Sequence, residues 1–153
     1  MDYTQAFAIS AAGMSVERTR VDVAAVNLAN ANTVQAADGN VFKPLRAVAR
    51  AANSAVATFA DLVDPTGVLA PASLSAAALP TVSVEAADVI PRQVYEPGHP
   101  FANTKGFVSY PGVDTAVEMV TMMSATRAYE ANVAAMNAAR TMALKALDIG
   151  GAS

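Results

Sequence analysis

A heptad pattern runs along the last part of the chain and restricts its fold more than any other feature. Nine positions follow one another at alternating steps of three and four residues, and seven of them are apolar. Such spacing is typical of a helix whose apolar seam packs against another helix. The nine positions are Met119, Met122, Thr126, Tyr129, Val133, Met136, Arg140, Ala143 and Leu147.

The predicted C-terminal helix begins after Asp114, an N-cap residue, and runs to about Ile149, where Gly150 and Gly151 stop it. About 36 residues at roughly 1.5 Å each span about 54 Å. A compact domain of 153 residues is only about 40 Å across. The helix therefore extends beyond such a body with its seam exposed, so it needs a partner helix.

A second helix is predicted from about Tyr3 to Asn30 and is the obvious partner within the chain. Its apolar positions, together with Thr19, also follow heptad steps, and a second apolar row repeats every seven residues. Gly13 either permits a close approach between two helices or has no structural role. The first row is Ile9, Ala12, Val16, Thr19, Val23 and Val26, and the second is Phe7, Met14, Val21 and Leu28.

The composition favours helices over a self-sufficient globular core. Hydrophobic residues make up 54% of the chain, but many are alanine, only 6% are aromatic and tryptophan is absent. Alanine favours helix formation and fills little volume. We therefore predict a mainly α fold: long N- and C-terminal helices that form a coiled coil, with a small, irregular, β-containing middle region.

The middle region holds all eight prolines and several short alternating segments that are typical of strands. Residues 65–80 are rich in Ala, Ser and Pro and carry no charge, which indicates a loop. The chain thus divides into an N-terminal assembly helix (1–33), a middle domain (34–112) and a C-terminal assembly helix (113–153). The predicted strands are Phe42–Ala49, Thr81–Glu85, Arg92–Tyr95 and Gly106–Tyr110.

The charged residues indicate no enzyme and no nucleic-acid site. The net charge of −3 gives no basic footprint for nucleic acid, and zero cysteines exclude thiolate metal sites and a cysteine nucleophile. His99 is the one histidine, and its position between two prolines favours a turn. Asp114 and Glu118 suit the N-terminus of a helix, where they offset its dipole. We therefore predict no catalytic residue, cofactor, metal or small-molecule substrate.

Two further features leave alternatives open. Arg140 lies on the apolar seam, where its charge either pairs with a carboxylate across an interface or reaches solvent at the edge. Asn27, Asn30 and Asn32 alternate with small or apolar residues where the first helix ends. They either cap the helix or, as buried amides, fix helix register.

The segment Asn27–Thr33 resembles the N-terminal signature of the flagellar axial protein family, which forms the rod and hook. The segment Arg127–Val133, with Met136-Asn137, is similar to the C-terminal signature of that family. Between them, Tyr95–Pro100 and Gly106–Pro111 are similar to the proximal-rod members. The similarity thus spans both ends of the chain and the segment before the last helix.

This resemblance implies a structural subunit of the rod, in the periplasm, exported by the flagellar type III apparatus without a cleaved signal. The implied partners are the rod proteins FlgB, FlgF and FlgG, the basal-body protein FliE, and further copies of the chain. On this interpretation the terminal helices pack as a coiled coil in a helical tube and transmit torque. The predicted assembly interface is Ile9, Val16, Val23, Val26, Asn27, Leu28, Asn30, Asn32, Thr33, Met119, Met122, Thr126, Tyr129, Val133, Met136, Arg140 and Leu147.

Two other classes fit the same residues. A soluble coiled-coil adaptor or secreted interaction protein would bind a single partner through the same seam. An enzyme would have to combine His99 with a nearby carboxylate, and the sequence contains no recognisable nucleophile for such a pair.

Overall fold

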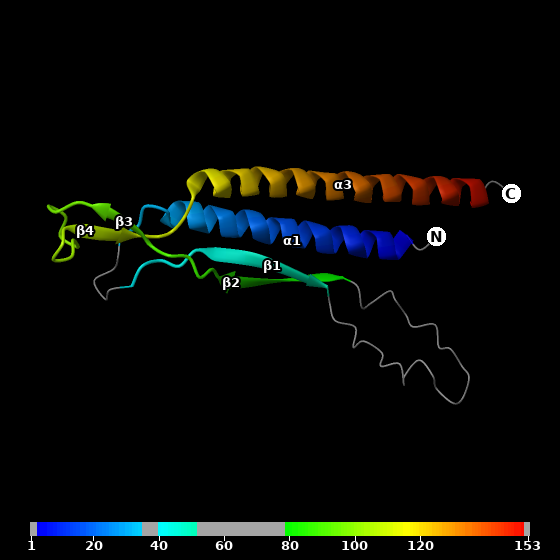
Figure 1. The fold of residues 1–153 in the computed structure, drawn as a ribbon. Coiled ribbons are helices and arrows are strands. Elements are labelled where there is room, and N and C mark those ends of the chain that lie inside the picture. Colours follow the sequence, from blue (N-terminus) through cyan, green and yellow to red (C-terminus); the bar gives the residue numbers. More distant parts are fainter. Residues whose placement is uncertain (1–2, 35–39, 52–78, 152–153) are drawn as a thin grey trace, which may run out of the picture.

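A computed structural model describes residues 3–34, 40–51 and 79–151. A helix lies at each end of the chain, and four short strands lie between the two helices in the sequence (Figure 1). The middle loop predicted at 65–80 lies almost entirely outside the described residues. The elements are α1 (Tyr3–Asn30), β1 (Leu45–Ala51), β2 (Pro80–Ala86), β3 (Arg92–Tyr95), β4 (Phe107–Tyr110) and α3 (Thr115–Gly151).

The two helices lie side by side and run antiparallel (Figure 1). Gly13 of α1 lies against Asn132 of α3, and Asn27 lies against Glu118. Both intervals are fourteen residues, so the two helices keep a constant register between these contacts. With 37 residues, α3 is roughly 56 Å long at about 1.5 Å per residue. Its C-terminal end extends beyond the start of α1.

The sequence predicted the helix boundaries well, with one correction at the C-terminus. The bounds of α1 are those expected, and Asp114 caps α3, since its Oδ1 accepts hydrogen bonds from the amides of Ala116 (2.9 Å) and Val117 (3.3 Å). The helix does not stop at Ile149 but continues to Gly151. Among the described glycines only Gly106 has a positive φ, so Gly150 does not adopt the left-handed backbone that ends many helices.

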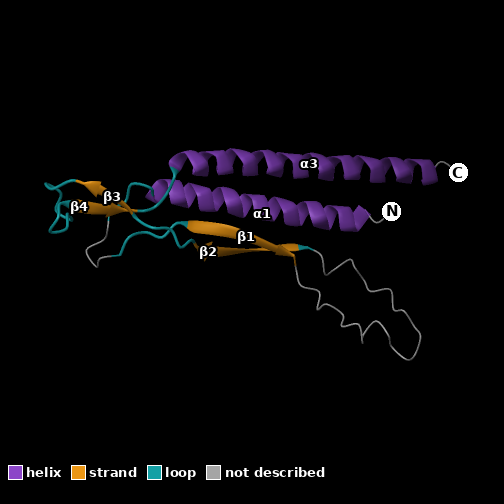
Figure 2. Cartoon of the chain, viewed as in Figure 1, coloured by secondary structure: helices purple, strands orange, loops and turns teal. Residues whose placement is uncertain are grey.

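The first hairpin lies along α1. Strands β1 and β2 are antiparallel, with Leu45 opposite Ala86, and β1 is the strand nearer the helix (Figure 2). The prediction for β2 is confirmed, whereas β1 begins at Leu45 rather than Phe42. Pro44 has no amide hydrogen to donate to a partner strand, so only its carbonyl pairs, accepting from the amide of Ala87 (2.7 Å), and the regular ladder begins with Leu45.

The second hairpin lies beyond the C-terminal end of α1, at one end of the molecule (Figure 1). Arg92 of β3 pairs with Tyr110 of β4, and the predicted strand Arg92–Tyr95 is confirmed. Strand β4 starts at Phe107, one residue later than expected, because Gly106 has φ of 80°, which is incompatible with a regular strand.

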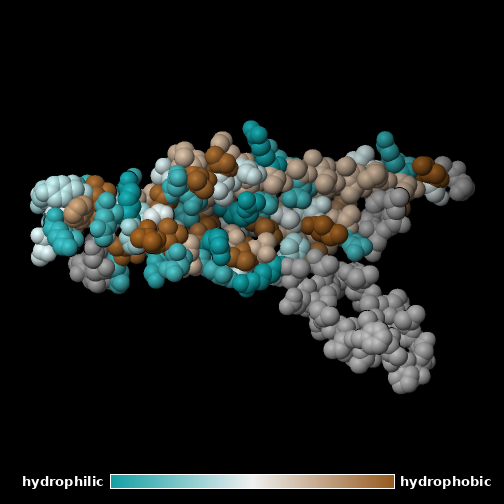
Figure 3. All heavy atoms as spheres, viewed as in Figure 1, coloured by the Kyte–Doolittle hydropathy of each residue, from teal (hydrophilic) through white to brown (hydrophobic). Residues whose placement is uncertain are grey.

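The core of the described residues is thin and made mostly of small side chains. Large apolar side chains are instead exposed, and Figure 3 shows several of them at the surface over α3. This agrees with the alanine-rich composition. The buried apolar residues are Val16, Val23, Ala24, Ala31, Val108, Ala125 and Ala139.

Candidate assembly surface of the helix pair

The side chain of Asn27 joins three elements. Its Nδ2 donates to the carbonyl of Leu45 in β1 (2.8 Å) and to Oε1 of Glu118 in α3 (2.9 Å). Its Oδ1 accepts from the amide of Leu45 (2.8 Å), and the residue is only 1% exposed. The amide thereby uses both of its donors and its acceptor. Of the two alternatives for Asn27, the buried amide is the one observed.

The other polar residues of the signature lie at the end of α1 and behave as ordinary helix-end residues. Nδ2 of Asn30 donates to the carbonyl of Val26 (2.8 Å), and the hydroxyl of Thr33 donates to the carbonyl of Asn30 (2.8 Å). Asn32 is exposed. The alternating asparagines therefore have different roles, although the pattern presents them as equivalent.

Small residues let the two helices approach each other. A Cβ atom at Gly13 would lie 2.9 Å from Oδ1 of Asn132, and Nδ2 of Asn132 donates to the carbonyl of Ala128 (3.0 Å). Ala125 of α3 is fully buried and Ala139 is nearly so. Of the two alternatives for Gly13, the close approach is the one observed.

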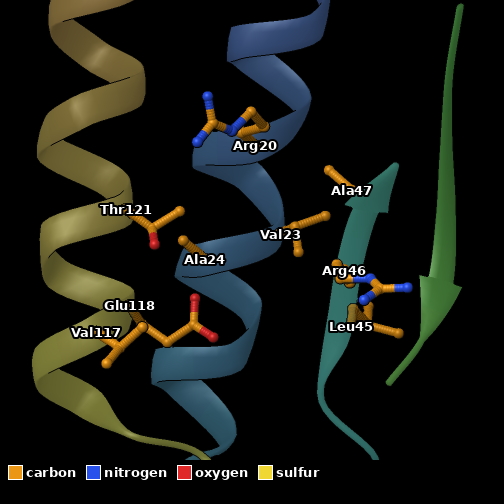
Figure 4. Close-up of a pocket in the computed structure, with 9 residues that line it drawn as sticks. All are labelled: Arg20, Val23, Ala24, Leu45, Arg46, Ala47, Val117, Glu118 and Thr121. Carbon is orange, nitrogen blue, oxygen red and sulfur yellow. The ribbon is translucent and has the colours of Figure 1, made fainter. Parts of the chain in front are cut away.

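The predicted apolar row of α1 does not face α3 as a whole. Val16 and Val23 are buried, but Ile9 is 53% exposed and Val26 is 41% exposed. In Figure 4, Val23 points toward β1 whereas Ala24 points toward α3. The residues labelled there line a pocket between α1, β1 and the start of α3. Its volume is about 300 Å³. The row therefore contributes to packing against the first hairpin. The contact with α3 uses a neighbouring row.

The predicted seam of α3 lies beside the intrachain contact rather than in it. Met122 and Met136 are half-buried, whereas Met119 is 51% exposed and Leu147 is 71% exposed. The side chains that approach α1 lie one position earlier, at Glu118, Ala125, Asn132 and Ala139. Thr126, Tyr129, Val133 and Arg140 are also exposed.

Val21, from the second predicted row of α1, and Tyr129, from the predicted seam of α3, meet on one flank of the helix pair. A groove of about 300 Å³ there is lined by Arg18, Val21, Thr126 and Tyr129. Leu28 is seven residues from Val21, so it shares that face of α1, and it is half-buried.

Arg140 forms no hydrogen bond or ion pair within the described residues. Its side chain is exposed, so its charge stays hydrated and no burial cost arises.

The surface of α3 carries large apolar residues that sequence reasoning did not assign to an interface. All of them are highly exposed. The sequence feature that could have identified them is their size in a helix otherwise rich in alanine. Within the described part of the chain, neither helix is long and apolar enough to cross a membrane. These residues are Val117, Val120, Met123, Met142, Leu144 and Ile149.

The second hairpin brings three titratable side chains together: Arg92, Glu96 and Tyr110. The hydroxyl of Tyr110 donates to Oε2 of Glu96 (3.2 Å), and the guanidinium carbon of Arg92 lies 5.5 Å from the Tyr110 ring centroid. Partial desolvation and the Glu96 carboxylate raise the pKa of Tyr110 above its ordinary value of 10.0, while Arg92 opposes that rise. The neutral hydroxyl, which donates to Glu96, is therefore favoured over the tyrosinate.

His99 lies in the loop that connects β3 to β4. Its Nδ1 accepts a hydrogen bond from the amide of Phe101 (3.2 Å), and its carbonyl accepts from the amide of Ala102 (3.0 Å). These are the contacts of a turn residue. Among the described residues, no three His, Cys, Asp or Glu side chains are placed to hold a metal ion.

Comparison with known proteins gives one consistent result. Residues 104–149, which include β4 and nearly all of α3, match the family described as flagellar basal body rod FlgEFG protein C-terminal. The flagellar basal-body rod protein FlgC of Escherichia coli O6:H1 is 36% identical over 149 residues, covering 94% of this chain and 95% of that protein. FlgC of Bacillus subtilis is 35% identical over 143 residues, covering 93% and 94%.

A distant relative extends the same result. FlgC of Borreliella burgdorferi is 30% identical over 151 residues, covering 92% of this chain and 93% of that protein. The similarity therefore includes both terminal helices and the strands between them. The chain belongs to the FlgC family of flagellar basal-body rod proteins and is a structural subunit of the flagellar rod.

Proposed function

We propose that this rod subunit polymerises through its two terminal helices and transmits torque through the contacts between them. The observation that carries the proposal is the exposed apolar surface of α3, which includes Met119, Leu147 and Ile149 at 51%, 71% and 79% exposure. Burying one such side chain contributes about 1.5 to 3 kcal/mol. Association of helices from neighbouring subunits supplies that burial.

In the assembled rod the helices form a coiled coil, and the predicted seam of α3 is the row that neighbouring subunits cover. We propose the same three-part division of the chain, with assembly helices at 1–33 and 113–153 and the middle domain of 34–112 between them. The proposed location is the periplasmic part of the rod, and the proposed partners are FlgB, FlgF, FlgG, FliE and further copies of the chain.

The free subunit is expected to hold its C-terminal helix loosely. In the register that places Gly13 beside Asn132, Tyr3 lies level with about residue 142, so later residues extend past the described start of α1. Leu144, Leu147 and Ile149 are more than half exposed. Hydrogen exchange of the purified chain tests this expectation. Amides near Leu144–Gly151 should exchange much faster than those near Ala125, and they should become protected in assembled rods. Full protection of Thr115–Ile149 amides in the monomer would contradict it.

Co-assembly distinguishes a rod subunit from an adaptor. The purified chain, mixed with FlgB, FlgF and FlgG, should form extended rods that are visible by electron microscopy, whereas an adaptor would form only finite complexes. We also propose that the chain has no catalytic role. The His99→Ala variant should then assemble and support motility as the unmodified chain does. A variant that assembles normally but no longer supports motility would indicate a catalytic role for His99.

A further inference from the structure

Two helix faces that lie mostly away from the α1–α3 contact are exposed and follow heptad steps. Arg18, on the first of them, also reaches the flank groove that Thr126 and Tyr129 of α3 line. On α1 the face lies about half a turn from the row that contains Gly13 and Asn27, and on α3 it lies about half a turn from Ala125 and Asn132. We name them the outer face of α1 and the outer face of α3. The first is Ala11, Ser15, Arg18, Asp22, Ala25 and Ala29; the second is Val120, Met123, Arg127, Glu130, Ala134, Asn137 and Thr141.

Each outer face carries one cation and one anion at its centre. Arg18 and Asp22 lie on α1, and Arg127 and Glu130 lie on α3. None of these four side chains forms an ion pair or hydrogen bond within the described residues, in contrast with Arg20, which pairs with Glu17 at 2.9 Å. The two faces therefore hold four charges that are free to pair with a neighbouring molecule.

The order of the charges selects one relative direction of the helices. If an outer face of α1 packs antiparallel on an outer face of α3, Arg18 lies opposite Glu130 and Asp22 lies opposite Arg127. Parallel packing would instead place Arg18 beside Arg127 and Asp22 beside Glu130, with like charges in contact. Opposite-charge pairs favour the antiparallel arrangement, and like-charge pairs disfavour the other.

The same register matches side-chain size. Ser15 lies opposite Ala134, so two small residues allow the helices to approach. Ala25 lies opposite Met123 and Ala29 lies opposite Val120, so exposed apolar side chains meet alanines. A hollow of about 280 Å³ lined by Val120, Met123, Ser124 and Arg127 lies on this part of α3.

We propose that the outer face of α1 in one copy packs antiparallel on the outer face of α3 in a second copy. Because α1 and α3 are antiparallel within the chain, two copies joined in this way point in the same direction. The contact joins different surfaces, so it repeats from copy to copy. This inference rests on the proposed function, because it names a second pair of surfaces, beside the seam of α3, through which copies of the rod subunit meet.

The register also fixes the axial displacement between the two copies. Within a chain, Asn27 lies level with Glu118, whereas between copies Arg18 lies level with Glu130. The two registers differ by about three to four residues, which at about 1.5 Å per residue displaces neighbouring copies by roughly 5 Å along the helix axis.

Cysteine cross-linking tests the register directly, because the chain has no native cysteine. The Ser15→Cys/Ala134→Cys chain is expressed in a flagellated cell that lacks its own subunit, and basal bodies are isolated and oxidised. The two cysteines lie on opposite sides of one molecule, so they can join only different copies. A ladder of covalent multimers is expected. The matched control, Ser15→Cys/Thr141→Cys, places the second thiol about two turns away and should give at least about tenfold less product.

Charge reversal tests the pairing. Arg18→Glu alone and Glu130→Arg alone should each lower the cross-link yield by about fivefold, and the two together should restore it, since every interface then contains the reversed pair. Basal bodies that contain the chain but give no ladder, or equal ladders from both cysteine pairs, would overturn the inference and leave the rod function intact. A chain that is absent from basal bodies would count against the rod function itself.

Discussion

The side chain of Asn27 donates a hydrogen bond to Glu118, although the two residues are 91 positions apart in the chain. The same amide also makes a two-way hydrogen-bonded pair with the backbone of Leu45. One buried side chain thus fixes where α3 and β1 begin relative to α1. A buried amide with every donor and acceptor used is costly to replace, because any substitution leaves a partner unsatisfied.

The first prediction concerns this junction. Asn27→Asp keeps the size of the side chain but removes both Nδ2 donors and places a carboxylate beside Glu118. The free energy of unfolding should fall by about 3 kcal/mol. Urea denaturation followed by circular dichroism measures the change. The matched control is Asn32→Asp, at an exposed position, and this variant should stay within about 0.5 kcal/mol of the unmodified chain. Equal losses of stability at the two positions would show that the hydrogen bonds of Asn27 do not stabilise the fold.

The second prediction concerns the approach of the two helices at Gly13. In an Asn132→Ala background, Gly13→Ala should raise the free energy of unfolding by about 1 kcal/mol through helix propensity. In the unmodified chain the new Cβ lies 2.9 Å from Oδ1 of Asn132, so the same substitution should lose that gain. A double-mutant cycle measures the coupling. Identical effects of Gly13→Ala in the two backgrounds would show that the contact is absent.

The third prediction concerns the second hairpin. Gly106 has φ of 80°, and a Cβ there would lie 2.8 Å from Cε2 of Tyr95. Gly106→Ala should therefore lower the free energy of unfolding by about 1 to 2 kcal/mol. Gly98→Ala in the same loop meets nothing within 4 Å and serves as the control. Thermal denaturation of the two variants should separate them, and a harmless Gly106→Ala would contradict the turn geometry.

The fourth prediction concerns pH. The folded-state pKa of Tyr110 is raised, so the unfolded chain releases this proton at a lower pH than the folded chain does. The stability that the neutral hydroxyl contributes is fully present below about pH 10 and is lost as the pH rises through the raised value. Tyrosinate absorbance, compared with that of Tyr110→Phe, isolates this group among the four tyrosines.

The same titration has an internal control. Glu96→Gln removes the carboxylate that favours the neutral hydroxyl, so the pKa of Tyr110 should fall toward 10. Arg92→Gln removes an opposing positive charge, so the pKa should rise further. A Glu96→Gln variant with an unchanged Tyr110 titration would show that the carboxylate does not act on this group.

Local sequence signals predicted the elements because each has a local physical cause. The carboxylate of Asp114 caps α3, and period-two alternation gave β2. The start of β1 was predicted three residues too early because the pattern gave no weight to the missing donor of Pro44. The helix end at Gly151 was missed because glycine permits a helix stop without enforcing one.

The direction of each helix face could not be predicted in the same way. Heptad spacing gives the period of a helix but not which of two neighbouring rows meets which partner. The seam predicted from spacing contains Met119 and Leu147, whereas the contact within the chain uses Gly13, Ala125 and Asn132, since small residues allow a closer approach. Glu118 was assigned to the helix dipole, and nothing local to it reveals a partner as distant in sequence as Asn27.

The pairing of α1 with α3 places a condition on timing. A chain that is made or delivered from its N-terminus presents Asn27 and Gly13 well before Glu118 and Asn132 arrive to meet them. During that interval α1 has only the first hairpin to pack on. The α1–α3 contact therefore forms only after α3 has emerged. A chain that ends before Thr115 leaves α1 without the helix that it packs against.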